Sequence, residues 1–153
     1  MTSLQIGDKA PDFNALNENG ELISLANYVG KKLILYFYPK DMTPGCTAES
    51  CNLGENYNLL KEKGFEIIGV SPDPAKRHLK FIEKYNLPFT LLADEDRKVL
   101  EAYNVWGLKK FMGREYDGVH RTTFVIDEKG LIEKIFTKVK TKDHTNQILE
   151  SYK

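Results

Sequence analysis

Cysteine is scarce in this chain, because its 153 residues include two, Cys46 and Cys51. A domain of this size builds its own hydrophobic core and does not need cysteines as structural cross-links. In a reducing compartment, such a close pair is typically catalytic, redox-sensing or metal-binding. Zinc is disfavoured, since two cysteines and the scattered histidines His78, His120 and His144 show no common ligand spacing. We therefore expect a reactive pair and no metal.

An excess of charge of either sign is also lacking, since 22 basic residues balance 22 acidic ones. This balance argues against binding to nucleic acid or to an anionic membrane. No apolar stretch is long enough to span a bilayer, and Met1–Pro11 carries charged Asp8 and Lys9 instead of a signal-peptide core. With 41% hydrophobic and 29% charged residues, residues 1–153 are expected to form a single soluble, cytoplasmic domain.

Two nearly continuous apolar runs, Lys32–Tyr38 and Phe65–Val70, predict strands that are buried on both faces. Between them, Cys46–Lys63 repeats its apolar residues at helical spacing, with Cys46 on the inward stripe. A strand, a helix and a second strand in this order predict a right-handed crossover unit in a parallel sheet.

Turn-forming residues separate the remaining elements. Asn17–Gly20 predicts the turn of an amino-terminal hairpin, and Asp127–Gly130 predicts the turn of a second hairpin. Val105–Gly118 holds glycines among aromatic and charged residues and is expected to be an irregular excursion. The other predicted elements are strands at residues 12–16, 21–25, 89–93, 121–126 and 131–136, and helices at residues 74–85, 97–103 and 143–152. This order predicts an α/β protein and resembles a thioredoxin-like fold, with a mixed central sheet flanked by helices and an N-terminal hairpin addition.

The segment Pro39–Cys46 joins the end of a buried strand to the start of a helix. Cys46 then lies in the first helical turn, where amides without intrahelical acceptors stabilise an adjacent thiolate. Thr43 comes three residues before Cys46, so its hydroxyl can point at the sulfur. Pro39 and Pro44 restrict the conformations of the loop. The segment therefore predicts a rigid pocket around a reactive thiolate.

Pro39, Thr43 and Cys46 resemble the signature Pro-x-x-x-Thr/Ser-x-x-Cys of the peroxiredoxins, which also follows an apolar strand in that family. Three segments resemble the bacterioferritin comigratory protein branch of the family, namely Asp41–Glu49, Val105–Gly107 and Asp117–Arg121. The resemblance covers nearly the whole chain.

This resemblance implies a thioredoxin-dependent thiol peroxidase that reduces hydrogen peroxide and organic hydroperoxides in antioxidant defence. It implies that Cys46 is the nucleophile that becomes a sulfenic acid, and that Cys51 is the resolving thiol of an intramolecular disulfide. It also implies that Arg121 faces the sulfur, where it favours the thiolate and, with Thr43, contacts the peroxide. No cofactor is needed, because sulfur carries the electrons, and resolution within one chain favours a monomer.

Each of these side chains also has a plain structural explanation. Cys46 would be a small buried hydrophobe, Cys51 an inert helical residue, and Arg121 a solvated surface charge. Glu49 either orients Arg121 or simply suits the first turn of a helix.

Three large side chains, Trp106, Phe111 and Met112, either line the mouth of the pocket, cover Cys51, or anchor a loop to the body of the protein. Two rival functions also stand beside the peroxidase. One is a thiol–disulfide oxidoreductase, which the lack of a Cys-x-x-Cys spacing disfavours, and the other is a redox sensor without turnover.

Overall fold

The computed structural model describes residues 2–153. Its elements in chain order are β1 (Asn14–Leu16), β2 (Leu22–Ser24), the 3-10 helix η1 (Leu25–Tyr28), β3 (Lys32–Phe37), α1 (Pro44–Glu55), α2 (Tyr57–Glu62), β4 (Phe65–Ser71), α3 (Ala75–Tyr85), β5 (Thr90–Ala93), α4 (Lys98–Ala102), β6 (Trp106–Phe111), β7 (Arg114–Val119), β8 (Thr122–Ile126), β9 (Ile132–Phe136) and α5 (His144–Glu150). Among these residues, none of the helices is both long and apolar enough to cross a membrane.

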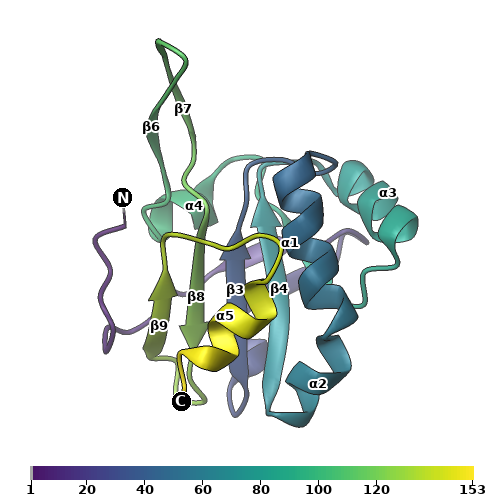
Figure 1. Ribbon diagram of the computed structural model, residues 1–153, viewed down its shortest axis with the longest axis vertical. Coiled ribbons are helices and arrows are strands. Elements are labelled where there is room, and N and C mark those ends of the chain that lie inside the picture. Colours follow the sequence, from purple (N-terminus) through teal and green to yellow (C-terminus); the bar gives the residue numbers. More distant parts are fainter. Residues whose placement is uncertain (1) are drawn as a thin grey trace.

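A five-stranded sheet forms the centre of the fold, with its strands in the order β5-β4-β3-β8-β9. The pairs β3–β4 and β4–β5 are parallel, whereas β3–β8 and β8–β9 are antiparallel. The sheet is therefore mixed, as predicted. The crossover from β3 through α1 to β4 places the start of α1 beyond the carboxyl end of β3 (Figure 1).

The central sheet carries a hydrophobic core on each face. Alternate residues of a strand point to opposite faces, so β3 supplies both cores. Leu33 and Leu35 pack with η1 and α4, whereas Ile34 and Tyr36 pack with α1, α2, α3 and α5. Cys46 belongs to the second core, on the face that α1, α2 and α5 cover in Figure 1. The predicted inward position of Cys46 is therefore confirmed.

The predicted helix at residues 46–63 is divided at Asn56 into α1 and α2. Asn56 leaves the helical conformation, with φ −104° and ψ 12°. Its side-chain amide donates a hydrogen bond to the backbone oxygen of Asn52 over 2.8 Å. A short polar side chain that bonds to the backbone in this way competes with the helical hydrogen bonds. Both cysteines lie before the break, in the twelve residues of α1.

The expectation of an irregular excursion at residues 105–118 is wrong, because β6 and β7 pair as an antiparallel hairpin. Its turn is made by Met112 and Gly113, whose φ angles are 51° and 76°. Two successive residues with positive φ suit the twist of hairpin strands, but a methionine is not among the residues that signal such a turn. The hairpin projects beyond the central sheet at the top of Figure 1.

Smaller differences concern the ends of strands. The amino-terminal hairpin is present as β1 and β2, and both strands are shorter than predicted. Arg121 precedes β8 and does not begin it, because β8 starts at Thr122. Arg121 therefore belongs to the short connection between the projecting hairpin and the central sheet.

Candidate active site

Cys46 lies in the first turn of α1, as the sequence predicted. Thr43 is the N-cap residue, with extended backbone angles of φ −83° and ψ 153°, and Pro44 begins the helix. Proline suits this position because its missing N–H would have no intrahelical acceptor. The unpaired amide groups of the first turn of a helix favour an anion near that end. Only 1% of the surface of Cys46 is exposed.

Arg121 brings a positive charge to this sulfur. Its Nη2 donates a hydrogen bond to Sγ of Cys46 over 3.2 Å. Burial alone would lower the pKa of Arg121, but the neighbouring Glu49 and Cys46 outweigh it and raise that pKa above its ordinary value. The side chain is 23% exposed, so the guanidinium forms part of the boundary between the sulfur and solvent. The structure thus joins two residues that the sequence separates by 75 positions.

Glu49, whose role the sequence left open, is the second partner of Arg121. Nη1 of Arg121 donates to Oε1 of Glu49 over 2.6 Å, within an ion pair. The carboxyl group is fully buried. Burial raises its pKa to about 7, although Arg121 acts in the opposite direction. Glu49 therefore orients Arg121, and it changes its protonation state near neutral pH.

His144, the first residue of α5, also lies near the site. No pattern in the sequence relates it to Cys46. Its Nδ1 donates to Oε1 of Gln147 over 2.8 Å, so Nε2 is the acceptor of the hydroxyl of Thr123, also at 2.8 Å. Burial lowers the pKa of His144 to about 4. The 3.6 Å separation between its Nε2 and Oε2 of Glu49 is therefore not an ion pair at neutral pH. Within residues 2–153, that Oε2 has no hydrogen-bond partner.

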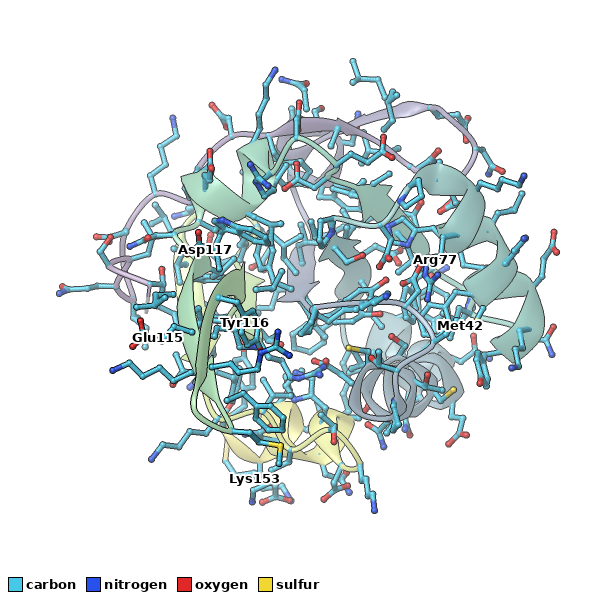
Figure 2. All side chains as sticks on the ribbon, turned by 90° about the horizontal axis from the view of Figure 1, so that it is seen from above. Met42, Arg77, Glu115, Tyr116, Asp117 and Lys153 are labelled. Carbon is cyan, nitrogen blue, oxygen red and sulfur yellow. The ribbon has the colours of Figure 1, made fainter. Side chains whose placement is uncertain are left out.

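Thr43 and Pro39 lie in the loop that precedes α1. The hydroxyl of Thr43 donates to the backbone oxygen of Lys40 over 2.7 Å. Its proton is thus engaged within the loop, while the oxygen keeps lone pairs that can accept a hydrogen bond. Pro39 is half-buried at the end of β3. Seen from above, Met42 of this loop lies on the same side as Arg77, and Tyr116 of the projecting hairpin lies on the other side (Figure 2).

Cys51 lies in the same helix as Cys46, and both are free thiols. Burial, and then the charge of Glu55, raises the pKa of Cys51. Five residues of regular helix separate two Cα atoms by roughly 8.6 Å and turn their side chains about 140° apart. A disulfide needs Cα atoms about 4.4 to 6.8 Å apart with converging side chains. The two sulfurs therefore cannot bond while this part of α1 is helical.

The large side chains of β6 and the following turn have different roles. Trp106 packs against the core on the opposite face of the sheet, and the guanidinium of Arg97 lies 4.8 Å from the centre of its ring. This contact favours the anchoring explanation for Trp106. Phe111 and Met112 lie at the far end of the hairpin, where Met112 is 84% exposed. Lys109 of β6 is nearer to the site: burial and Arg121 lower its pKa, and Cys46 opposes them.

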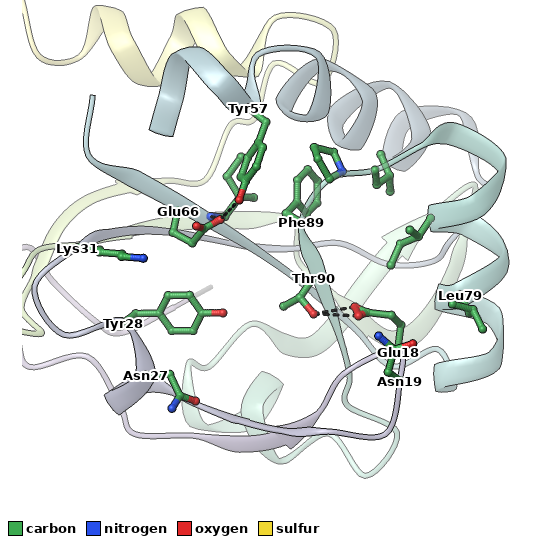
Figure 3. Close-up of a pocket in the computed structure, with 14 residues that line it drawn as sticks. Glu18, Asn19, Asn27, Tyr28, Lys31, Tyr57, Glu66, Leu79, Phe89 and Thr90 are labelled. Carbon is green, nitrogen blue, oxygen red and sulfur yellow. Dashed lines mark hydrogen bonds between the residues drawn. The ribbon is translucent and has the colours of Figure 1, made fainter. Parts of the chain in front are cut away.

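The largest cavity described, about 590 Å³, contains none of the residues expected at the active site. It lies beside β4 and β5, where the side chains of Tyr57, Glu66 and Thr90 line it (Figure 3). Glu66 accepts a hydrogen bond from the hydroxyl of Tyr57 over 2.7 Å, and Glu18 accepts one from Thr90, also over 2.7 Å. Both carboxylates are therefore engaged in hydrogen bonds, Glu66 with the start of α2 and Glu18 with the edge strand β5.

Comparison with known proteins places the chain in a family. The model of the AhpC/TSA family matches residues 6–135. Peroxiredoxin Bcp of Bacillus subtilis is 49% identical over 151 residues, which are 99% of this chain and 96% of that protein. Peroxiredoxin Bcp of Escherichia coli is 45% identical over 149 residues, with coverages of 97% and 96%. A structure of the bacterioferritin comigratory protein of Xanthomonas campestris, described with alkyl peroxide reduction activity, is 30% identical, with a TM-score of 0.87 and coverages of 99% and 96%.

The chain therefore belongs to the AhpC/TSA family. Its relatives over nearly the full length are peroxiredoxins, so the predicted thiol peroxidase activity is confirmed. The same comparisons confirm the thioredoxin-like fold and the resemblance to the bacterioferritin comigratory protein branch.

Proposed function

We propose that Cys46 is the thiolate that attacks the peroxide. The observation that carries this assignment is the hydrogen bond from Arg121 to Sγ of Cys46 at the start of a helix. A guanidinium and a helix amino terminus both favour the ionised sulfur. The thiolate attacks one oxygen of the substrate, a sulfur–oxygen bond forms, and the oxygen–oxygen bond breaks. Sulfur loses two electrons to become a sulfenic acid, and the departing oxygen takes a proton to become water or an alcohol.

Arg121 and Thr43 have complementary tasks in this step. Arg121 donates hydrogen bonds, so it stabilises the negative charge that develops on the departing oxygen. The hydroxyl of Thr43 donates its proton in a hydrogen bond to the backbone oxygen of Lys40. The oxygen of Thr43 therefore accepts a hydrogen bond from the peroxide hydroxyl. One donor and one acceptor define a single orientation of the oxygen–oxygen bond relative to Cys46. Pro39 holds the start of the loop that carries Thr43.

Cys51 is the proposed resolving thiol. It attacks the sulfur of the Cys46 sulfenic acid, forms an intramolecular disulfide and releases water. Because the helix keeps the two residues apart, the first turns of α1 must unwind before this bond closes. Unwinding also takes Cys51 away from its half-buried position near Glu55, which removes the causes that raise its pKa and favours its thiolate.

An external dithiol then restores both cysteines, and thioredoxin or a similar small protein is the proposed donor of these two electrons. We infer that hydrogen peroxide and organic hydroperoxides are the substrates, that no cofactor takes part, and that the protein acts as a cytoplasmic monomer. One observation supports the monomer: the thiol, its resolving partner and its arginine all come from one chain. The shared central sheet supports a single domain.

A coupled assay with thioredoxin, thioredoxin reductase and NADPH tests this proposal, with the chain at catalytic concentration. Cys46→Ser is expected to abolish peroxide-dependent NADPH loss, because a serine hydroxyl neither ionises at neutral pH nor forms a sulfenic acid. Cys51→Ser is expected to consume one equivalent of peroxide and then stall or accumulate sulfinic acid at Cys46. Substantial turnover by Cys46→Ser, or full-speed turnover by Cys51→Ser, would contradict the corresponding assignment.

A further inference from the structure

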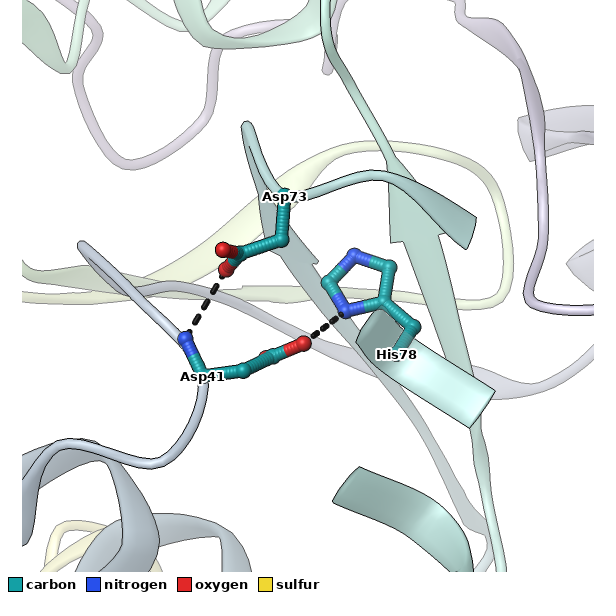
Figure 4. Close-up of side chains that lie close together, drawn as sticks. All are labelled: Asp41, Asp73 and His78. Carbon is teal, nitrogen blue, oxygen red and sulfur yellow. Dashed lines mark hydrogen bonds and ion pairs between the residues drawn. The ribbon is translucent and has the colours of Figure 1, made fainter. Parts of the chain in front are cut away.

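Asp41 lies in the loop between β3 and α1, and its side chain is completely buried. The hydroxyl of Tyr38 donates to its Oδ1, and Nδ1 of His78 lies 2.6 Å from its Oδ2. The backbone of Asp41 is held as well, because its N–H donates to Oδ2 of Asp73 over 2.8 Å (Figure 4). Its carbonyl accepts from Nη2 of Arg77 over 3.1 Å. These five residues are called the Asp41 clamp below.

The contact between Asp41 and His78 is a short hydrogen bond inside the core. Nε2 of His78 lies 2.8 Å from the backbone oxygen of Leu92, which can only accept, so Nε2 donates there. The proton between Nδ1 and Oδ2 is then shared by an imidazole and a carboxyl group, both completely buried. Removing one partner would leave the other without compensation in the core. The pair therefore ties the loop firmly to α3 and, through Leu92, to β5.

Asp41, Asp73 and His78 each offer a ligand atom, and these atoms lie within 4.8 Å of one another. Their polar atoms are already engaged, however. Oδ2 of Asp73 accepts from the hydroxyl of Ser71 over 2.6 Å as well as from the backbone of Asp41. A cation would have to displace these hydrogen bonds. The cluster is therefore arranged to hold the loop and not to bind a metal.

The residues after Asp41 lead directly to the reactive thiol. Met42 has a φ of 68°, a left-handed conformation that residues with side chains rarely adopt. Such a conformation persists only where the surrounding structure imposes it. Thr43 comes next and is the N-cap residue of α1. Holding Asp41 thus holds the backbone that places Thr43 and the first turn around Cys46.

We propose that the Asp41 clamp is a positioning element for the peroxide reaction and the boundary at which the unwinding of α1 stops. This inference rests on the proposed roles of Cys46 and Cys51. Loosening the clamp lowers the population of the geometry that attacks peroxide, but it does not hinder the unwinding that disulfide closure requires. The two chemical steps therefore respond differently: attack slows, while closure keeps its rate or becomes faster.

Two substitutions of His78 separate its two hydrogen bonds. His78→Gln places an amide nitrogen near the position of Nε2, which keeps a donor to Leu92 but leaves Oδ2 of Asp41 without one. His78→Asn places an amide nitrogen near the position of Nδ1, which keeps the donor to Asp41 and gives up the bond to Leu92. Both variants replace the imidazole with an amide, so the comparison of the two isolates the contact with the loop. Ile82→Ala, on the same helix, is the control for lost stability.

Rapid mixing with hydrogen peroxide, acid quench and intact mass measurement follow the dithiol, sulfenic acid and disulfide forms in time. Attack is first order in peroxide and first order in protein, so its rate depends on the peroxide concentration. Closure is first order in the sulfenic acid form and does not depend on peroxide. In His78→Gln we expect attack to slow by about tenfold or more, because small displacements of reacting groups are costly. Closure should be at least as fast as in the wild type. Sulfinic acid, which forms when a second peroxide oxidises the sulfenic acid and leaves water, should then fall relative to disulfide.

His78→Asn should retain most of the attack rate, and Ile82→Ala should lose stability without this split between the steps. Equal impairment of His78→Asn and His78→Gln, or wild-type rates in His78→Gln, would overturn the inference. If His78→Gln does not fold, Arg77→Met removes the part-buried contact with the Asp41 carbonyl and the ion pair with Asp73, and it should slow attack about twofold to fivefold. Wild-type kinetics in that variant would also overturn the inference. Wild-type protein and Cys46→Ser in the same series test the proposed function separately.

Discussion

Arg121 donates a hydrogen bond from Nη2 to Sγ of Cys46 over 3.2 Å, while its Nη1 is held 2.6 Å from Oε1 of Glu49. The forked guanidinium thereby connects two residues of one helical face, at positions three apart in α1. Glu49 controls where the guanidinium lies, and Arg121 controls the charge beside the sulfur. The helix end and the arginine thus act on the same atom from different directions.

Arg121→Met is expected to slow peroxide attack by about 10- to 100-fold, because a hydrogen bond to a charged group contributes about 1.5 to 3 kcal/mol. Alkylation of Cys46 at neutral pH should slow as well, because the variant removes the cation that contacts the sulfur. Arg121→Lys is the control: it keeps the charge but cannot span Cys46 and Glu49 together, so an intermediate rate is expected. Unchanged alkylation and peroxide rates in Arg121→Met would remove Arg121 from the site.

Gly45 permits the close approach of Arg121 to the helix. A Cβ atom at this position would lie 3.2 Å from Nη2 of Arg121, so the guanidinium would have to move by a few tenths of an ångström. Gly45→Ala should stabilise α1 by up to about 1 kcal/mol and yet slow peroxide attack several-fold, measured by urea unfolding and rapid mixing.

Gly54→Ala is the matched control at the other end of α1, where a Cβ would meet Pro88 at 3.2 Å instead of Arg121. It should leave the attack rate close to that of the wild type. If both alanine variants slow attack equally, the effect belongs to the helix and not to Arg121.

Hydrogen exchange tests the unwinding of α1. Amides from about Thr47 to Leu53 should exchange markedly faster in the disulfide form than in the dithiol form, because the bond cannot close in a regular helix. The buried strand from Leu33 to Phe37 serves as the internal control and should stay protected in both forms. Equal protection of the helical stretch, with the disulfide confirmed by mass, would refute this mechanism.

Glu49 should make stability depend on pH in a direction opposite to most carboxylates. Its folded pKa is about 7 and its unfolded value is 4.5, so the folded state holds the proton between these values. Stability from this group is complete below about pH 4.5 and is lost as pH rises towards 7. Glu49→Gln stays neutral throughout, so it should gain stability relative to the wild type by up to about 3 kcal/mol over that window.

Urea unfolding of both proteins at about pH 4.5, 6 and 8 measures this difference. His144 titrates in the same region with the opposite sign, because burial lowers its pKa to about 4, but it is present in both proteins and cancels. A difference between wild type and Glu49→Gln that does not grow with pH would show that Glu49 is not the group responsible.

The part of the site that could be predicted lies within one short stretch of sequence. A strand, a loop with two prolines and a helix are local features, so they place Thr43, Cys46 and Cys51 without reference to the rest of the chain. The hairpin of β6 and β7 was not predicted, and the reason is also local. Met112 occupies a turn position with positive φ, where asparagine, aspartate or glycine is the usual residue.

The sequence by itself determined the reactive element: a thiol in the first turn of a helix, a second thiol five residues later, and nearly continuous apolar strands that are buried on both faces. Only the tertiary structure decided what surrounds it. The contacts of Cys46 with Arg121, of Glu49 with Arg121, and of Asp41 with His78 join segments that no local periodicity relates. Their hydrogen bonds and charges depend on distance and burial, and those exist only once β3, β8, α3 and α5 have packed on one another.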